Sequence, residues 1–214
     1  MPKKLLSLLG AVSIIAIYAC RKEKSLEALI TTTPCTYAPY TVGSSFIYQY
    51  INSKGEASLY TLTVRADTSI NGKSYAILHD GYNSQFVRCD NGKYFLYEPP
   101  VSLEDYKLIP GDRLFLQDGY PAGATWTDTV MGSMSGVAQT GLLQYHILER
   151  DVEKTVMGKT YQNVIAVRQD AAVLMAGTTY PVGTVATYYY SPGVGYIETV
   201  SATDTIRLVN HSIH

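Results

Sequence analysis

Apolar and polar residues alternate in short stretches along most of this chain. The stretch 59–65 places Tyr60, Leu62 and Val64 on one face and polar side chains on the other. A period of two is typical of a half-buried strand. Residues 46–51 are rich in aromatic and β-branched side chains, which also favour strands. Beyond the N-terminal segment no window carries a helical apolar stripe longer than two turns, so the pattern predicts an all-β protein.

Turn-forming residues separate these stretches and predict three hairpins. Asn71-Gly72 offers the positive φ angles of a tight turn before a returning strand at residues 73–78. Asp90-Asn91-Gly92 does the same between two aromatic stretches, and Ser191-Pro192-Gly193 ends a strand at residues 185–190. Further strands are expected at residues 114–116, 142–150, 161–169, 194–200 and 205–209.

Two stretches lack the strand pattern. Residues 131–141 are small and uncharged and include three glycines, which predicts a mobile loop or a rim that faces a ligand. The last residues, with His211 and His214, are expected to be disordered, as chain ends often are.

The second half of the chain resembles the first. An offset of this size is too long for a short solenoid unit. It predicts duplicated antiparallel sheets that form a sandwich or a half-open barrel, and chance similarity among strands rich in Tyr, Thr and Gly is the alternative. The matching pairs are Gly43–Phe46 with Gly123–Trp126, Tyr60–Leu62 with Tyr145–Ile147, Ile70–Tyr75 with Val156–Tyr161, and Phe95–Glu98 with Gly195–Glu198.

The same pattern divides the chain into five segments, with the two β-repeats expected to form one compact domain. They are a signal peptide at 1–19, a cysteine and flexible tether at 20–41, a first β-repeat at 42–100, a connector at 101–122 and a second β-repeat at 123–214.

Composition narrows the function classes. Charged residues make up 16% of the chain and the net charge is −1, which leaves no basic field for nucleic acid. Tyrosine is unusually common, with 19 copies against four phenylalanines and one tryptophan. Tyrosine suits a half-buried pleated surface, and it also builds stacking platforms for sugars or flat ligands.

The N-terminus has the pattern of an export signal. A basic head at Lys3-Lys4 precedes an apolar run of roughly 15 residues, too short for the 20 or so of a spanning helix, and a small residue stands before Cys20. This resembles the bacterial lipoprotein lipobox. The resemblance implies cleavage before Cys20 and attachment of fatty acyl groups such as palmitate to that residue. An anchor helix with an incidental cysteine is the alternative.

A second resemblance lies near the C-terminus. Residues 188–197 form an aromatic strand that turns through Pro-Gly-Val-Gly, where Gly193 and Gly195 permit a positive-φ return. With the lipobox, this stretch resembles small Bacteroidota outer-membrane lipoproteins of unassigned function. The resemblance implies an all-β exported domain and no catalytic residue. It places the protein in the cell envelope, lipid-anchored to the outer membrane, with the periplasmic face favoured and the cell surface as the alternative because of the charged cluster at 21–25.

Candidate chemistry is sparse. His79-Asp80 resembles half of a catalytic constellation, but no Gly-x-Ser-x-Gly elbow accompanies it. His211 and His214 have no third metal ligand close in sequence. We therefore expect no enzyme activity, no metal and no cofactor. With Cys20 lipidated, Cys35 and Cys89 form either a disulfide or two free thiols.

Three functions fit these patterns. The first is a non-catalytic binding or structural lipoprotein, whose partners are the membrane and an envelope protein. The second is a carrier of an apolar ligand in a half-barrel cavity, and the third is a glycan-binding accessory protein. A cavity lined by aliphatic side chains would favour the carrier, and exposed Tyr and Trp on one face would favour the glycan binder. The expected ligand-facing residues are Trp126, Met131, Met134, Tyr188 and Tyr190.

Overall fold

The computed structural model describes residues 35–103 and 106–214, so the signal peptide, Cys20 and most of the tether lie outside the described residues. The described part contains 14 strands and no helix. The strands are β1 (Ser45–Ile51), β2 (Ala57–Ile70), β3 (Lys73–His79), β4 (Ser84–Asp90), β5 (Lys93–Glu98), β6 (Val101–Leu103), β7 (Tyr106–Leu108), β8 (Gly111–Gln117), β9 (Thr125–Met134), β10 (Val137–Val156), β11 (Lys159–Met175), β12 (Thr178–Ser191), β13 (Gly195–Val200) and β14 (Thr205–Ser212).

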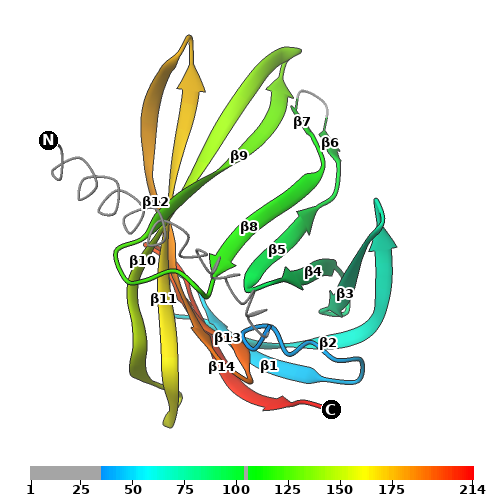
Figure 1. Cartoon of the computed structure of the whole chain (residues 1–214), viewed down its shortest axis with the longest axis vertical. Helices are drawn as coiled ribbons and strands as arrows, with labels where there is room; N and C mark the ends of the chain where they lie inside the picture. The colour runs from blue at the N-terminus through cyan, green and yellow to red at the C-terminus, as the bar shows by residue number, and fades with distance from the viewer. Residues whose placement is uncertain (1–34, 104–105) are drawn as a thin grey trace, which may run out of the picture. The chain divides into compact units, whose positions relative to one another are not determined.

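All strands belong to one antiparallel sheet. Its order is β6-β7-β9-β10-β11-β12-β13-β14-β1-β2-β3-β4-β5-β8, so the last strand of the chain pairs with the first. The sheet is strongly curved and encloses an interior between its two halves (Figure 1). The prediction of an all-β fold, as an antiparallel sandwich or half-open barrel, is confirmed. Within the described ranges, no helix has the length and apolar character needed to cross a membrane.

The predicted hairpin turns are present with the expected backbone angles. Asn71 and Gly72 have φ values of 51° and 75°, and Met157 and Gly158 of the second half have 49° and 79°. Gly195 needs its missing side chain for a further reason. A Cβ there would lie 3.1 Å from the Tyr40 hydroxyl and 3.2 Å from the Tyr37 carbonyl oxygen.

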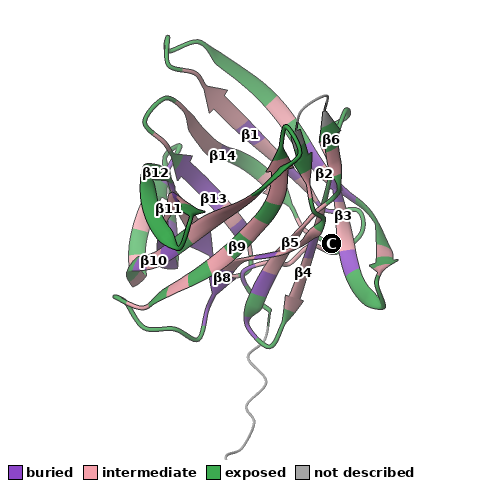
Figure 2. Cartoon of the chain, turned by 90° about the horizontal axis from the view of Figure 1, so that it is seen from above, coloured by how far each residue is buried: buried purple, intermediate pink, exposed green. Residues whose placement is uncertain are grey.

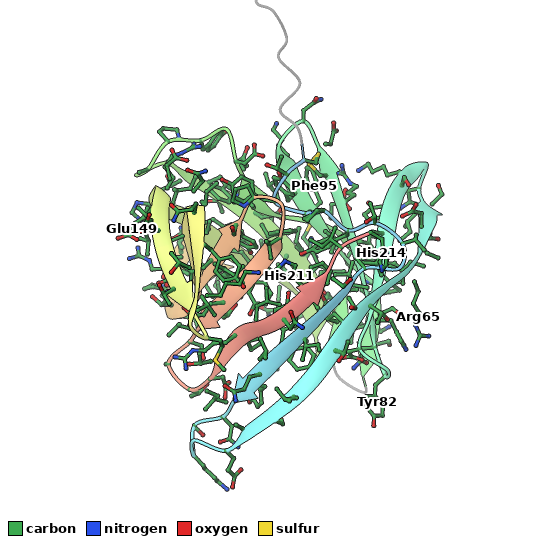
Figure 3. The ribbon with its side chains drawn as sticks, turned by 90° about the horizontal axis from the view of Figure 1, so that it is seen from below. Arg65, Tyr82, Phe95, Glu149, His211 and His214 are labelled. Carbon is green, nitrogen blue, oxygen red and sulfur yellow. A yellow bond between two sulfur atoms is a disulfide. The ribbon has the colours of Figure 1, made fainter. Side chains whose placement is uncertain are left out.

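Most residues of the two stretches without a strand pattern belong to strands, so the predictions of a mobile loop at 131–141 and of a disordered C-terminus were wrong, whereas a ligand-facing rim at 131–141 stays a prediction. Residues 131–141 form the tip of the β9–β10 hairpin, because β7 and β11 supply backbone hydrogen-bond partners to small residues that favour no local structure. His211 belongs to β14, and the main chain of His214 is held by Thr41 and Ser44 (Figure 3).

The connector also holds more structure than expected. The predicted strand at 114–116 belongs to the longer β8, and β6 and β7 precede it as a short two-stranded extension beside the tip of β9. The proposed repeat stays a prediction. Its matched segments nevertheless occupy equivalent places, since β1 and β9 each open a run of antiparallel neighbours.

The sheet curls until β8 lies beside β9, and this junction is the seam of the fold. Among the described residues no backbone ladder joins these two strands; side chains bridge them instead. The indole N–H of Trp126 donates to the Leu114 carbonyl at 2.9 Å, and the Leu114 N–H donates to the Asp128 carboxylate at 2.7 Å. These side chains therefore give hydrogen-bond partners to backbone groups of the edge strand β8 that would otherwise be unpaired.

Buried positions lie within the strands, and the hairpin tips are exposed (Figure 2). The buried apolar side chains pack inside the sheet. They form two apolar clusters. One contains Phe46, Tyr48 and Ile197, and the other contains Tyr94, Tyr145 and Ile165. The core is thus rich in tyrosine, in agreement with the composition.

Candidate functional site

The N-terminal strap, residues 35–41, packs across the inner edge of the sheet. A disulfide joins Cys35 to Cys89 of β4, so the pairing that the sequence left open is formed in the structure. The Tyr37 hydroxyl donates to the Asn163 carbonyl at 2.8 Å, and Gly193 N–H donates to the Thr36 carbonyl at 2.7 Å. The strap is thereby attached to both halves of the sheet.

A buried chain of hydrogen bonds also holds the strap against the sheet. The Tyr94 hydroxyl accepts from Tyr37 N–H at 3.2 Å and donates to the Asp118 carboxylate at 2.6 Å. Burial raises the pKa of Asp118, and burial also raises the pKa of Tyr94. Tyr94 consequently stays a neutral donor, which suits a structural link better than a catalytic one.

Inside the curved sheet lies a cavity of about 480 Å³. This volume falls within the range of small-molecule sites. Its wall is mostly apolar and aromatic, with a few polar groups, and it draws on strands from both halves of the sheet. The lining residues are Tyr40, Tyr48, Tyr60, Leu62, Leu78, Gln85, Val87, Leu96, Glu98, Arg113, Phe115, Leu143, Tyr145, Gln169, Tyr188, Tyr190, Tyr196, Thr199 and Ile206.

Seven of these lining residues are tyrosines, and burial raises the pKa of each one. The pKa reaches about 12 at Tyr40 and at Tyr60. The same direction holds for the other five, Tyr48, Tyr145, Tyr188, Tyr190 and Tyr196. At neutral pH the tyrosines therefore present rings and uncharged hydroxyls to the cavity.

A polar chain crosses one side of the wall. The Tyr188 hydroxyl donates to the Gln169 amide oxygen at 2.9 Å, and the Gln169 amide N–H donates to the Tyr145 hydroxyl at 3.1 Å. Arg113 and Glu98 bring the only charges among the lining residues. This wall suits a ligand with a large apolar body and a small polar or charged part.

The predicted ligand-facing residues fall in different places. Tyr188 and Tyr190 line the cavity. Trp126 does not, but its ring stacks on the cavity residue Tyr145 with centroids 5.1 Å apart. Met131 and Met134 are 51% and 60% exposed near the tip of β9. Their contact with any ligand stays a prediction.

The register of β9 and β10 separates the two methionines. Met134 pairs with Val137, which shares its face of the sheet with the cavity residues Leu143 and Tyr145. Met131 pairs with Thr140 and faces the other side. Met134 therefore stands beyond the cavity, on an uncharged rim formed by the tips of β9–β10 and β11–β12, residues 131–141 and 171–187.

His79 and Asp80 make local contacts at the surface of the sheet. His79 Nδ1 lies 3.2 Å from the Ser84 hydroxyl on the surface, and the Asp80 carboxylate accepts from the N–H groups of Tyr82 and Asn83 in a tight turn. These backbone bonds lower the pKa of Asp80. In the described residues no cluster of three metal-ligating side chains occurs.

Sequence reasoning missed Arg113, Gln169 and Tyr48 as members of one wall. Each of the three lies in a predicted strand or beside one. The alternation of side chains along a strand predicts which face of that strand a residue occupies, but not which other strands lie next to it. Only strand order brings the three together, because they come from β8, β11 and β1.

Comparison with known proteins gives matches in structure but not in sequence. No protein-family model matches the chain, and no curated protein matches it either. A candidate exported protein with a YmcC-like fold from Bacteroides fragilis superposes with a TM-score of 0.50 at 10% identity, over 83% of this chain and 99% of that one. This likeness shows a shared fold and carries no residue role.

Two further solved structures are similar over the same share of this chain, 83%. A candidate lipoprotein from Parabacteroides distasonis has a TM-score of 0.48 at 14% identity and is covered over 99% of its length. The hypothetical lipoprotein YmcC from Escherichia coli has a TM-score of 0.39 at 9% identity and is covered over 89%.

Proposed function

We propose that this protein is an exported, lipid-anchored binding protein that holds a small ligand inside its curved sheet and performs no chemistry on it. The observation that carries the proposal is the 480 Å³ cavity, whose wall combines seven neutral tyrosines with aliphatic side chains. A concave, mostly apolar pocket with few polar groups is the usual form of a small-molecule site.

The placement of the aromatic residues favours a carrier over a glycan-binding surface. Glycan binding on a flat face needs several exposed aromatic rings side by side. Of the exposed tyrosines, Tyr82 is in a loop and points away from the sheet (Figure 3), and Tyr180 is on β12. Tyr120, in another loop, makes an edge contact with Trp126 at 6.1 Å, but Trp126 is itself half-buried, so these rings do not form a broad exposed face. Leu62, Leu78 and Val87 add an aliphatic surface inside.

Three observations support an exported location. The N-terminal residues resemble a lipoprotein signal, and Cys35 and Cys89 form a disulfide, which persists in oxidising compartments. The Bacteroides fragilis protein that shares the fold is described as a candidate exported protein. We place the protein on the outer membrane, anchored through Cys20, with its periplasmic face favoured and the cell surface as the alternative.

Replacement of Cys20 by serine tests the anchor. We expect the membrane-extracted wild-type protein to begin at Cys20 and to carry the mass of several acyl chains, since stable anchoring takes more than one chain. The C20S variant should lose that lipid mass completely. Intact-mass analysis of both proteins measures this, with the Cys35–Cys89 disulfide as the internal check of folding. An unmodified Cys20 with the leader still attached would refute lipidation.

Filling the cavity tests the binding site. Leu143 lines the cavity, and its replacement by tryptophan should weaken binding of the uncharged dye N-phenyl-1-naphthylamine about tenfold, because overlap with added side-chain atoms costs about 1–3 kcal/mol. The measurement is dye emission during titration of the full-length protein held in amphipol, with an amphipol blank subtracted.

Leu148 supplies the matched control on the same strand. It is 38% exposed and does not line the cavity, so Leu148→Trp should leave dye affinity unchanged. Equal affinity in the Leu143→Trp variant would show that the dye binds elsewhere. Absence of saturable binding in the wild type would refute the proposed function.

A further inference from the structure

Arg113 is a buried charge that forms no ion pair among the described side chains. Its side chain lines the cavity, the residue is 8% exposed, and its Nε is buried with no hydrogen-bond acceptor in the described part of the chain. The guanidinium always carries its charge in proteins. Burial of such a group is costly unless an anion or strong acceptors compensate it.

The acceptors that Arg113 does have are neutral and distant. Its terminal nitrogens donate to the carbonyls of Asp112, Thr129 and Ile109 at 3.4, 3.3 and 3.4 Å. Ordinary N–H···O bonds cluster near 2.9–3.0 Å, and charge-assisted bonds are shorter still. These three contacts position the side chain but leave most of its charge uncompensated.

Two shielded carboxylates of the sheet each hold two cations. Asp112, the neighbour of Arg113 on the outer face, holds Lys73 at 2.9 Å and Arg88 at 2.7 Å. Glu198 likewise holds Lys154 at 2.7 Å and Arg207 at 3.0 Å. Arg113 has no comparable ion pair among the described side chains on the inner face, where a ligand would lie.

The surroundings of Arg113 include two carboxylates, Glu98 on the cavity wall and Asp128 on β9, and one extended polar group. Glu98 lines the same cavity, but it forms no ion pair with Arg113 among the described side chains. The neutral Tyr145 hydroxyl lies in the field of Asp128 and, more weakly, of Arg113, and it begins the chain to Gln169 and Tyr188. The Asp128 carboxylate accepts from the Leu114 N–H instead of pairing with Arg113, so the Arg113 Nε keeps no acceptor among the described residues.

We propose that Arg113 binds the anionic group of an amphipathic ligand, a carboxylate, sulfonate or phosphate, while the apolar body of the ligand packs among the tyrosines. This inference rests on the proposed function and adds the class of ligand. The planar guanidinium suits such oxyanions because two parallel N–H groups fit two oxygens.

Two dyes of nearly identical shape separate charge from apolar binding. The probes are 8-anilinonaphthalene-1-sulfonate, which carries an anionic group, and N-phenyl-1-naphthylamine, which lacks it. The full-length protein in amphipol contains a single tryptophan, Trp126, whose ring stacks on the cavity residue Tyr145. Energy transfer from Trp126 therefore reports dye in the cavity and excludes dye dissolved in the amphipol.

Replacement of Arg113 by methionine should weaken binding of the sulfonate dye about tenfold or more, the range of a charge-assisted hydrogen bond. Affinity for the uncharged dye should change by less than about twofold. Arg113→Lys keeps the positive charge but lacks the two parallel N–H groups of the guanidinium. Its affinity for the sulfonate dye should therefore lie between those of the wild type and the methionine variant. If Arg113 had only a structural role, its replacement would weaken the affinity for both dyes by a similar factor. That result would overturn the inference.

The wild-type protein provides a measurement that needs no variant to fold. Octanoate should displace the sulfonate dye at concentrations about tenfold lower than octanol, although octanol is the more apolar of the two. Equal or weaker displacement by octanoate would overturn the anionic class while leaving the cavity as a binding site. Binding of neither dye would overturn the proposed function and this inference together.

Discussion

A chain in which serine replaces both Cys35 and Cys89 is expected to lose about 4 kcal/mol of its free energy of unfolding. The disulfide closes a loop with a sequence separation of 54 residues, and in the chain-entropy model removal of such a link frees the unfolded chain by this amount. Cys35 is exposed and Cys89 is half-buried, so the substitutions leave little empty volume in the core.

Removal of the disulfide should destabilise the N-terminal strap first. Without the link, Tyr37 and the buried chain through Tyr94 to Asp118 must hold the strap alone. Tyr40 of the strap lines the cavity, so release of the strap should also weaken dye binding. The structural and functional effects of this disulfide are therefore expected to appear together.

Urea unfolding of wild type and double variant, followed by circular dichroism, measures the difference. The reduced wild type serves as the control and should unfold at the same urea concentration as the double variant, which itself should not respond to reductant. A difference below about 1 kcal/mol would mean that the loop-closure argument fails for this chain.

Replacement of Trp126 by alanine is expected to cost about 3 kcal/mol. The value lies at the lower end of the range for aromatic truncation because the ring is only partly buried. Three interactions disappear together: stacking on Tyr145 at 5.1 Å, an edge contact with Tyr120 at 6.1 Å, and the hydrogen bond to the Leu114 carbonyl. The seam between β8 and β9 should open.

Trp126→Phe is the matched control, because it keeps an aromatic ring and removes only the N–H donor. It should cost about 1 kcal/mol, the net value of one hydrogen bond. Hydrogen exchange gives the location of the damage: the Leu114 amide, which donates to Asp128 across the seam, should lose protection in the alanine variant. Equal costs for the two variants would show that the ring contacts contribute nothing.

The sequence predicted the local features of this fold well. The turns at Asn71-Gly72 and Gly193 appear where they were expected, with positive φ angles, since a tight return between strands requires them. The alternation of Tyr60, Leu62 and Val64 likewise places all three on one face of β2, with Leu62 and Val64 buried or nearly so against the core. Such signals depend only on neighbouring residues.

The sequence failed where partners distant along the chain decide the structure. Residues 131–141 contain glycine, serine and alanine, which have weak strand preference, yet β7 and β11 draw them into the sheet. The first part of β12, residues 178–184, is likewise a strand although Pro181 and Gly183 interrupt its strand-favouring residues. Hydrogen bonds across a sheet can outweigh local preference, and these bonds are invisible to a window of neighbouring residues.

The sequence by itself determined the all-β class, the turns, the two faces of the strand at residues 59–65 and the resemblance to exported lipoproteins, because each depends on residues close together in the chain. Only the tertiary structure decided how far the sheet curls, which edges meet at Trp126, and which side chains share the cavity. Arg113 illustrates the difference. As a residue in a strand it is ordinary, and it becomes a candidate anion-binding group only when the folded sheet buries it without an ion pair among the described side chains.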